Sequence, residues 1–148
     1  MSLITTIESE IKEAMKSREA ERRDALRLIV NALKGSEKEL QRPLSDDEEL
    51  QVLQRERKKR VEAAEAFRAG GREEQAATEE RELAILEEFM PEPLSEDEIE
   101  EIVDDAIAEV GATSMADLGR VMADVMPQVA GRADGSRVAA EVKRQLAD

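Results

Sequence analysis

Apolar residues recur every three or four positions through most of this chain, which is the spacing of amphipathic helices. No stretch shows the alternation of apolar and polar residues that is typical of a half-buried strand. The first helical stripe consists of Ile4, Ile7, Ile11, Ala14 and Met15. The pattern predicts seven helices, at about residues 3–18, 20 into the forties, 46–69, 72–89, 96–110, 115–126 and 135–146.

Two of these helices begin with the same local signal. Ser45 is followed three residues later by Glu48, so each side chain can bond the other's backbone N–H in a capping box. The same device recurs with Ser95 and Glu98, where the flanking Leu94 can also pack on the first turn of the helix. Because the surrounding patterns differ, we interpret the repeat as one capping solution used twice.

Glycine and proline mark the largest breaks. Gly70-Gly71 ends the third helix, and Met90-Pro91-Glu92-Pro93 imposes extended backbone after the fourth. We therefore predict an all-α, multihelical fold with a four-helix subdomain at residues 1–92 and a three-helix subdomain at residues 93–148. A unit of about 55 residues is small for independent stability, so we expect it to lean on the first part.

Composition supports this fold and removes several kinds of chemistry. Hydrophobic residues make up 41% of the 148 positions, but Phe67 and Phe89 are the only aromatic ones, so the core must be aliphatic. The chain has no cysteine and no histidine, which excludes disulfides, the usual zinc sites and Ser-His or Cys-His catalysis. No motif suggests a cofactor. No leader-like or membrane-spanning run occurs, so we expect a cytoplasmic protein.

The formal charge of −14 argues against a general affinity for polyanions. The charge is unevenly distributed, because residues 1–70 hold 15 basic and 15 acidic side chains and residues 71–148 hold 7 and 21. Any contact with phosphate must therefore come from a local cluster.

The first such cluster lies on the third helix. Arg55, Lys58 and Lys59 share one face with two glutamates, which is typical of a solvated surface with i,i+4 ion pairs. Arg57 and Arg60 fall within the apolar stripe instead. They either pair with acids on the second helix or open onto a groove that binds phosphate or carboxylate.

A second cluster, Arg18, Arg22, Arg23 and Arg27, is interleaved with acids, which favours an exposed face of mixed charge.

The third candidate is the segment from Gly119 to Gly135. Gly119, within a helix, suggests a close helix–helix approach. Gly131 suggests a backbone conformation that other residues resist, and Asp134 is placed to act as the N-cap of the last helix. Arg132, just before that helix, has no evident structural role. Together with Arg120 and Arg137 it would form a small basic site beside backbone donors.

Taken together, these stretches resemble the YqeY-like family over nearly the whole chain. One departure is Phe89-Met90-Pro91, where the family often has a Tyr-Leu-Pro type of sequence. The matching residues are Met15-Lys16, Leu26-Arg27-Leu28, Lys58, Arg60, Phe67, Gly70-Gly71-Arg72, Met90-Pro91, Leu94-Ser95, Glu98, Gly119-Arg120-Val121-Met122, Met126-Pro127 and Gly131-Arg132-Ala133-Asp134-Gly135.

The resemblance implies a helical module related to the tail of the B subunit of the tRNA-dependent Asp/Glu amidotransferase, where that tail helps to hold tRNA. We therefore expect a tRNA-associated module without its own active site, with tRNA and a tRNA-processing or aminoacylation enzyme as partners. The expected RNA contacts are Lys58, Lys59, Arg60, Arg120, Arg132 and Arg137.

Two alternatives stay open. One is an adaptor that docks on a partner enzyme through the methionines of the 115–126 helix, since the acidic charge and the lack of aromatic stacking residues favour a protein partner. The other is a carbon–nitrogen ligase activity with glutamine as amido donor, which would rest on the family resemblance alone.

Overall fold

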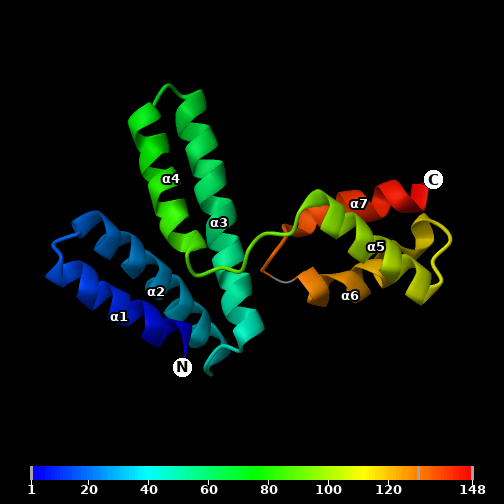
Figure 1. The fold of residues 1–148 in the computed structure, drawn as a ribbon, viewed down its shortest axis with the longest axis horizontal. Helices are drawn as coiled ribbons and strands as arrows, with labels where there is room; N and C mark the ends of the chain where they lie inside the picture. The colour runs from blue at the N-terminus through cyan, green and yellow to red at the C-terminus, as the bar shows by residue number, and fades with distance from the viewer. Residues whose placement is uncertain (1, 130, 148) are drawn as a thin grey trace. The chain divides into compact units, whose positions relative to one another are not determined.

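The computed structural model describes residues 2–129 and 131–147, and within them no strand occurs (Figure 1). The all-α prediction is therefore confirmed for the described residues. They form α1 (Leu3–Lys16), α2 (Ala20–Leu40), α3 (Asp46–Ala69), α4 (Glu73–Glu87), α5 (Glu96–Val110), the short 3-10 helix η1 (Met115–Asp117), α6 (Leu118–Val129) and α7 (Gly135–Ala147).

These helices belong to two compact units, residues 1–90 with α1 to α4 and residues 91–148 with α5 to α7. In the first unit, α1 and α2 form one helical hairpin and α3 and α4 form another, and α2 packs against both helices of the second hairpin (Figure 1). In the second unit, α5, α6 and α7 pack against one another in every pairing.

The first unit is built around an aliphatic core, as its composition predicts. Leucines of α2, α3 and α4 are fully buried there, and Phe89 and Met90 pack against its edge. The apolar pattern of the first two helices also places Met15 and Leu40 on inward faces, and this prediction is wrong, because Met15 is 53% exposed and Leu40 is 45% exposed. Met15 lies on the flank of the α1 stripe, and Leu40 ends α2 where Gln41 turns the chain in a left-handed conformation.

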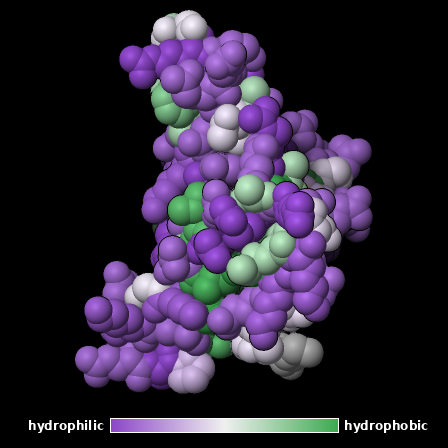
Figure 2. All heavy atoms as spheres, turned by 90° about the vertical axis from the view of Figure 1, so that its left-hand side faces the viewer, coloured by the Kyte–Doolittle hydropathy of each residue, from purple (hydrophilic) through white to green (hydrophobic). Residues whose placement is uncertain are grey.

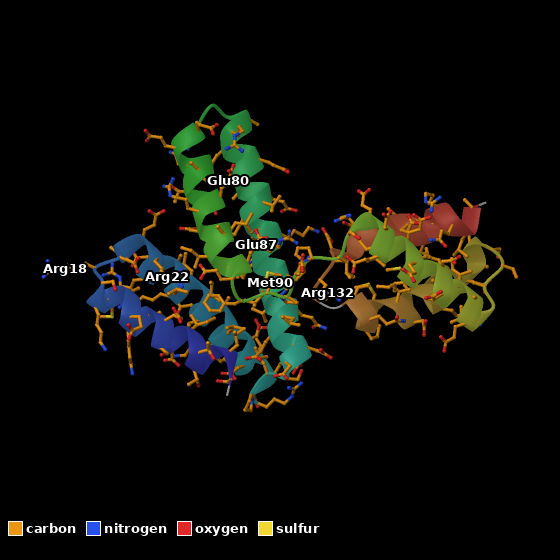
Figure 3. The ribbon with its side chains drawn as sticks, in the orientation of Figure 1. Arg18, Arg22, Glu80, Glu87, Met90 and Arg132 are labelled. Carbon is orange, nitrogen blue, oxygen red and sulfur yellow. The ribbon has the colours of Figure 1, made fainter. Side chains whose placement is uncertain are left out.

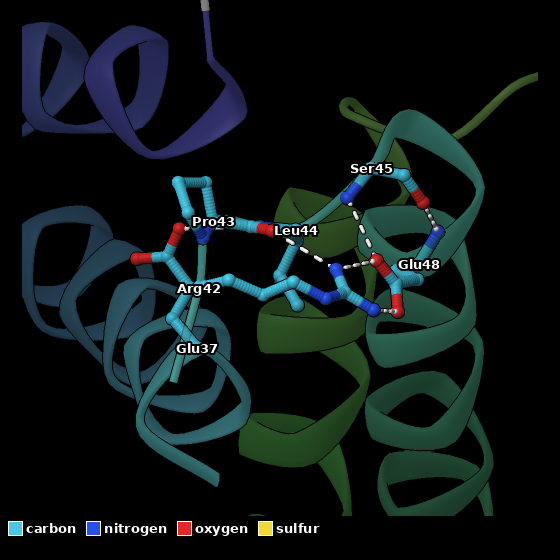
Figure 4. Close-up of polar contacts among 6 residues, drawn as sticks. All are labelled: Glu37, Arg42, Pro43, Leu44, Ser45 and Glu48. Atoms are coloured by element: carbon cyan, nitrogen blue, oxygen red, sulfur yellow. Dashed lines mark hydrogen bonds and ion pairs between the residues drawn. The ribbon is translucent and has the colours of Figure 1, made fainter. Parts of the chain in front are cut away.

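Both capping boxes form as predicted. The Ser45 hydroxyl accepts from Glu48 N at 3.2 Å, and Glu48 Oε1 accepts from Ser45 N at 2.9 Å (Figure 4). An unpredicted guanidinium completes this loop, because Arg42 donates to both Glu48 oxygens at 2.7 and 2.8 Å (Figure 4). These bonds hold the pKa of Glu48 at about 2, with the Arg42 hydrogen bonds as the largest cause.

The second unit has a valine-rich core. Val103, Val121, Val125, Val129, Val138 and Val142 are fully buried in it. The sequence predicts one helix over 115–126, but the chain forms η1 first and then α6, which continues past Pro127 to Val129. Met122 and Met126 pack against this core and are partly buried.

Three predictions about backbone and capping in this unit have different outcomes. Gly131 has a φ of 74°, and Asp134 Oδ1 accepts from Ser136 N at 3.0 Å at the start of α7, so both are confirmed. The prediction that Gly119 marks a close helix–helix approach is wrong, because a Cβ built there would meet nothing within 4 Å. Its position on the exposed side of α6 explains the open space.

No helix among the described residues is long and apolar enough to cross a membrane. The described residues also contain no group of three or more carboxylates suited to hold a metal ion.

Candidate nucleic-acid interface

The basic run on α3 divides between two faces of the helix. Lys58 and Lys59 are exposed, and Lys59 Nζ lies 3.6 Å from Glu56 Oε2 with 73% of the side chain exposed. Arg60 is only 20% exposed and turns toward α4. The three predicted RNA contacts on α3 therefore do not form one surface.

Arg60 belongs to an ion cluster between α3 and α4. Its Nη1 lies 3.2 Å from Glu79 Oε2 and 2.8 Å from Glu82 Oε2. Burial raises the pKa of Glu82 above its ordinary value, and the positive charge of Arg60 only partly offsets this effect. Arg57 likewise approaches Glu87, at 3.9 Å. The expectation that these arginines pair with acids is right, but their partners lie on α4 rather than on α2.

Arg55 joins the exposed lysines. Its Nη2 donates to Ser36 Oγ of α2 at 3.3 Å, and the side chain is otherwise exposed. Arg55, Lys58 and Lys59 follow one another within about one turn, so three cationic groups project from the outer face of α3. This exposed set is called the α3 basic face below.

In the second unit, Arg120 lies at the C-terminal end of α5. Its Nη1 donates to Asp117 Oδ1 at 3.1 Å and its Nη2 donates to the carbonyl of Val110, the last residue of α5. Asp117 also accepts from the backbone N–H of Thr113 at 2.9 Å, which is the main reason that its pKa is lowered. Arg120 thus binds a helix end whose orphan carbonyl needs a donor.

Arg132 has a structural role that the sequence did not suggest. Its Nε donates to the carbonyl of Glu92 at 3.1 Å, and its own carbonyl accepts from Leu94 N at 2.8 Å. The side chain and the backbone of one residue therefore hold the segment 92–94, which leads into α5. The expectation of an arginine without structural work is wrong.

Arg137 has the loosest contact of the three. Its Nη2 lies 3.7 Å from Glu96 Oε1, and about half of the side chain is exposed. Arg132 and Arg137 both border the start of α5, whereas Arg120 borders its end. Since α5 has 15 residues, its ends are roughly 20 Å apart. The three arginines therefore do not converge on one small basic site.

Acidic side chains surround Arg137. A groove between α5 and α7 is lined by Glu96, Asp97, Glu100 and Glu141 together with Arg137 and Arg144. Residues 91–148 hold 5 basic and 14 acidic side chains, a net charge of −9, whereas residues 1–90 hold 17 and 22, a net charge of −5. The potential of the second unit opposes an approaching phosphate backbone.

Two charged residues organise the first unit in ways that the sequence did not suggest: Glu49 was not a candidate, and Arg22 was assigned to an exposed face of mixed charge. Glu49 is only 8% exposed, and its Oε2 accepts from Leu3 N at 3.0 Å, which caps α1 from α3. Arg22 bridges Glu10 of α1 and Glu88 at the end of α4, at 3.4 and 2.7 Å. An acid within the inward stripe of α3 was the available signal for Glu49, because a buried carboxylate needs a donor.

Comparison with known proteins gives a family match and one distant relative. A protein-family model described as Yqey-like protein matches residues 4–146. An uncharacterized protein, C22F3.15, of Schizosaccharomyces pombe is 30% identical over 94 residues, which are 64% of this chain and 76% of that protein. The family match extends over α1 to α7, and neither match carries a statement about activity.

Proposed function

The chain belongs to the YqeY-like family, and we propose that it is a tRNA-associated helical module that works without an active site of its own. The observation that carries the proposal is the α3 basic face, where Arg55, Lys58 and Lys59 are exposed side by side in an otherwise acidic chain. Lysine and arginine side chains that neutralise phosphates supply most of the affinity for nucleic acid. The proposal assigns the main phosphate contact to this face.

The arginines of the second unit, Arg120, Arg132 and Arg137, have a smaller part in RNA binding than the sequence suggested. Arg120 and Arg132 are bonded to backbone carbonyls, so using them on RNA would leave α5 or the segment 92–94 without a donor. Arg137 is half exposed and only loosely paired, which makes it the tail residue best able to reach a phosphate. Arg60 pairs with glutamates of α4, so we assign it a role in holding α3 against α4 rather than a contact with RNA.

The direct test is tRNA binding by fluorescence anisotropy across a range of potassium chloride concentrations. With two or three phosphates contacted, log K should fall with log salt with a slope of about −2 to −3. A Lys58→Glu/Lys59→Glu variant should bind at least tenfold more weakly and show a shallower slope.

A matched control separates local contact from overall charge. Lys38→Glu/Lys143→Glu changes the net charge by the same amount at two exposed lysines away from the face. It should keep affinity within about threefold of the unaltered protein. Binding without salt dependence, or equal losses in both double variants, would rule out the α3 basic face as the RNA contact.

The two alternative functions are weighed on different grounds. The adaptor hypothesis relied on Met122 and Met126, which pack against the core of the second unit and so offer little free surface. Glutamine-dependent amide transfer by this chain would release glutamate from glutamine in the presence of charged tRNA. Glutamate release that exceeds the no-protein control would favour that hypothesis over a non-catalytic module.

A further inference from the structure

The helix α1 lies at the margin of the first unit and packs mainly against α2, so much of its surface faces solvent (Figure 1). Lys12, Met15 and Lys16 project from this surface, and all three are exposed. Met15, at 53%, is more exposed than Leu28 and Leu40, which are the other exposed large apolar side chains among the described residues of this unit. On the side of the molecule that Figure 2 shows, hydrophilic residues predominate and a smaller hydrophobic patch interrupts them.

Basic residues of α2 border the same surface. Arg27 Nη2 lies 3.8 Å from Met15 Sδ, and Lys34 Nζ lies 3.7 Å from Glu8 Oε2 of α1. Both contacts join α2 to the outer side of α1, so the two helices share one edge. Arg18 lies in the turn between the helices, with a φ of 59°, and points away from them (Figure 3). We call Lys12, Met15, Arg18 and Arg27 the α1–α2 edge.

Neighbouring acids balance the charge on this edge only in part: the pKa of Asp24 is lowered by its hydrogen bond with Arg23 and, to a smaller degree, by the charge of Arg27. Three acids beside it are in ion pairs, Glu13 with Lys16, Asp24 with Arg23 and Glu8 with Lys34, and Glu19, next to Arg18 in the sequence, is exposed. Within residues 2–129 and 131–147, Lys12, Arg18 and Arg27 form no salt bridge. Three cations therefore surround an exposed thioether in a chain with a net charge of −14.

We propose that the α1–α2 edge is a docking surface for an acidic amphipathic segment of a partner protein. Carboxylates of such a segment complement Lys12, Arg18 and Arg27, and one apolar side chain covers Met15. Methionine suits this role because its unbranched thioether side chain adapts to different partners. The contact buries an apolar group and neutralises cations that form no salt bridge within the described residues.

The same observations disfavour two other occupants. Sequence-tolerant binding of single-stranded RNA relies on aromatic side chains that stack on bases, and this edge has none, since Phe67 lies on α3 and Phe89 follows α4. A membrane surface needs a broad apolar face for insertion, and Met15 is one side chain.

The experiment uses a fluorescein-labelled synthetic peptide with the sequence of residues 95–111, an acidic amphipathic segment with eight carboxylates and no basic side chain. We expect a saturable rise in anisotropy with the full-length protein. Lys12→Glu/Arg27→Glu should weaken binding at least tenfold, and Met15→Ser about threefold. A peptide with Gln and Asn in place of Glu and Asp should bind at least tenfold more weakly.

The matched control is Lys38→Glu/Lys143→Glu, which changes the same charge at exposed lysines that belong to neither surface. It should keep peptide affinity within twofold. The proposal is overturned by the absence of saturable binding, by equal losses in both double variants, or by equal affinity of a scrambled peptide of the same composition. Circular dichroism of each variant verifies folding, and Met15→Ser, at an exposed position, provides a reading that charge reversal does not confound.

The two surfaces are separable in one crossed experiment. Lys58→Glu/Lys59→Glu should weaken tRNA binding and spare the peptide, and Lys12→Glu/Arg27→Glu should do the reverse. If Lys12→Glu/Arg27→Glu weakens tRNA and leaves the peptide unaffected, the edge is an RNA surface and the protein-docking proposal is wrong.

Discussion

Along α3 and α4, arginine–glutamate pairs line much of the helix–helix contact, whereas α5, α6 and α7 meet through valines. In the α3–α4 hairpin, Arg60 pairs with Glu79 and Glu82. Small residues of the same two helices, such as Ala64 and Ala76, are buried. In the second unit, six valines are fully buried and the ion pairs lie on the surface.

The difference teaches how each region should respond to its surroundings. Apolar burial is nearly independent of pH and does not weaken with salt. Half-buried ion pairs depend on protonation and on the fit between both partners. β-Branched valines also have few rotamers to lose on packing, which suits a small core that must be well ordered. The hairpin should therefore be the chemically sensitive region and the valine core the sterically sensitive one.

The largest effect should come from placing a charge in the valine core. Val125→Asp buries an unpaired carboxylate at a fully buried position, and we expect a loss of more than about 4 kcal/mol in unfolding free energy. Amide NMR spectra should show the signals of residues 91–148 collapse. Ala123→Asp, on the exposed side of α6, should leave them dispersed. Equal spectra for both variants would contradict the central place given to Val125.

A smaller loss should follow from breaking the ion cluster of the hairpin. Arg60→Met leaves Glu79 and Glu82 close together without a cation, at a cost of about 2 kcal/mol at pH 7.5 by urea unfolding. Lys59→Met, at an exposed lysine, should cost almost nothing.

The loss caused by Arg60→Met should also shrink as the pH is lowered to 5. Burial raises the pKa of Glu82, so its ionised form is the unfavourable one in the folded hairpin. Stability linked to this group is present below its unfolded pKa and is lost as the pH rises through the folded pKa. A loss that is independent of pH would show that Arg60 acts by packing alone.

Replacing a glycine by alanine should change the free energy of unfolding by a still smaller amount. The sign should differ between a glycine inside a helix and a glycine that ends one. Gly35 lies within α2 with nothing within 4 Å of a built Cβ, so Gly35→Ala should stabilise the first unit by about 0.5–1 kcal/mol. Gly111 ends α5 with a φ of 68°, so Gly111→Ala should destabilise the second unit by about 1 kcal/mol. Thermal unfolding of both variants tests the pair, and equal signs would contradict it.

The finest comparison is between the two capping boxes. Glu48 is bonded by Arg42 and has a pKa of about 2, whereas the pKa of Glu98 is lowered chiefly by its bonds with Ser95. Carboxyl NMR titrations should therefore give Glu98 the higher pKa.

The stability difference follows from the same shift. A lowered pKa gives stability that is present above the unfolded value of about 4.5 and is lost as the pH falls toward the folded value. The destabilisation caused by Glu48→Gln should persist to lower pH than that caused by Glu98→Gln. Coincident acid profiles would show that Arg42 adds nothing to the first box.

Local rules explain why much of the fold could be predicted from sequence. Helix α5 and both capping boxes have the predicted residues, because a cap depends on side chains three positions apart. The partners of Arg60 lie 19 and 22 residues away on another helix, and their choice depends on how α3 and α4 are aligned. No spacing rule encodes that alignment.

The candidate site was harder for the same reason. Lys58 and Arg60 are two residues apart in sequence, yet one faces solvent and the other faces α4. Arg132 looked unoccupied because its partners are the backbone carbonyl of Glu92, which accepts from its side chain, and the backbone N–H of Leu94, which donates to its carbonyl, and nearly every residue type supplies such groups. The sequence could indicate which cations exist, but only tertiary contacts decide which of them are accessible.

The double contact of Arg132 with the segment 92–94 has a mechanical consequence. A pull on the chain at Pro91 passes along the backbone through Glu92 and Leu94 before it reaches α5, and both residues are bonded to Arg132. Force is therefore shared with the junction that precedes α7 before it can unravel the first turn of α5. In a force-extension experiment, Arg132 would act as a clamp, and Arg132→Ala would lower the load at which residues 91–148 yield.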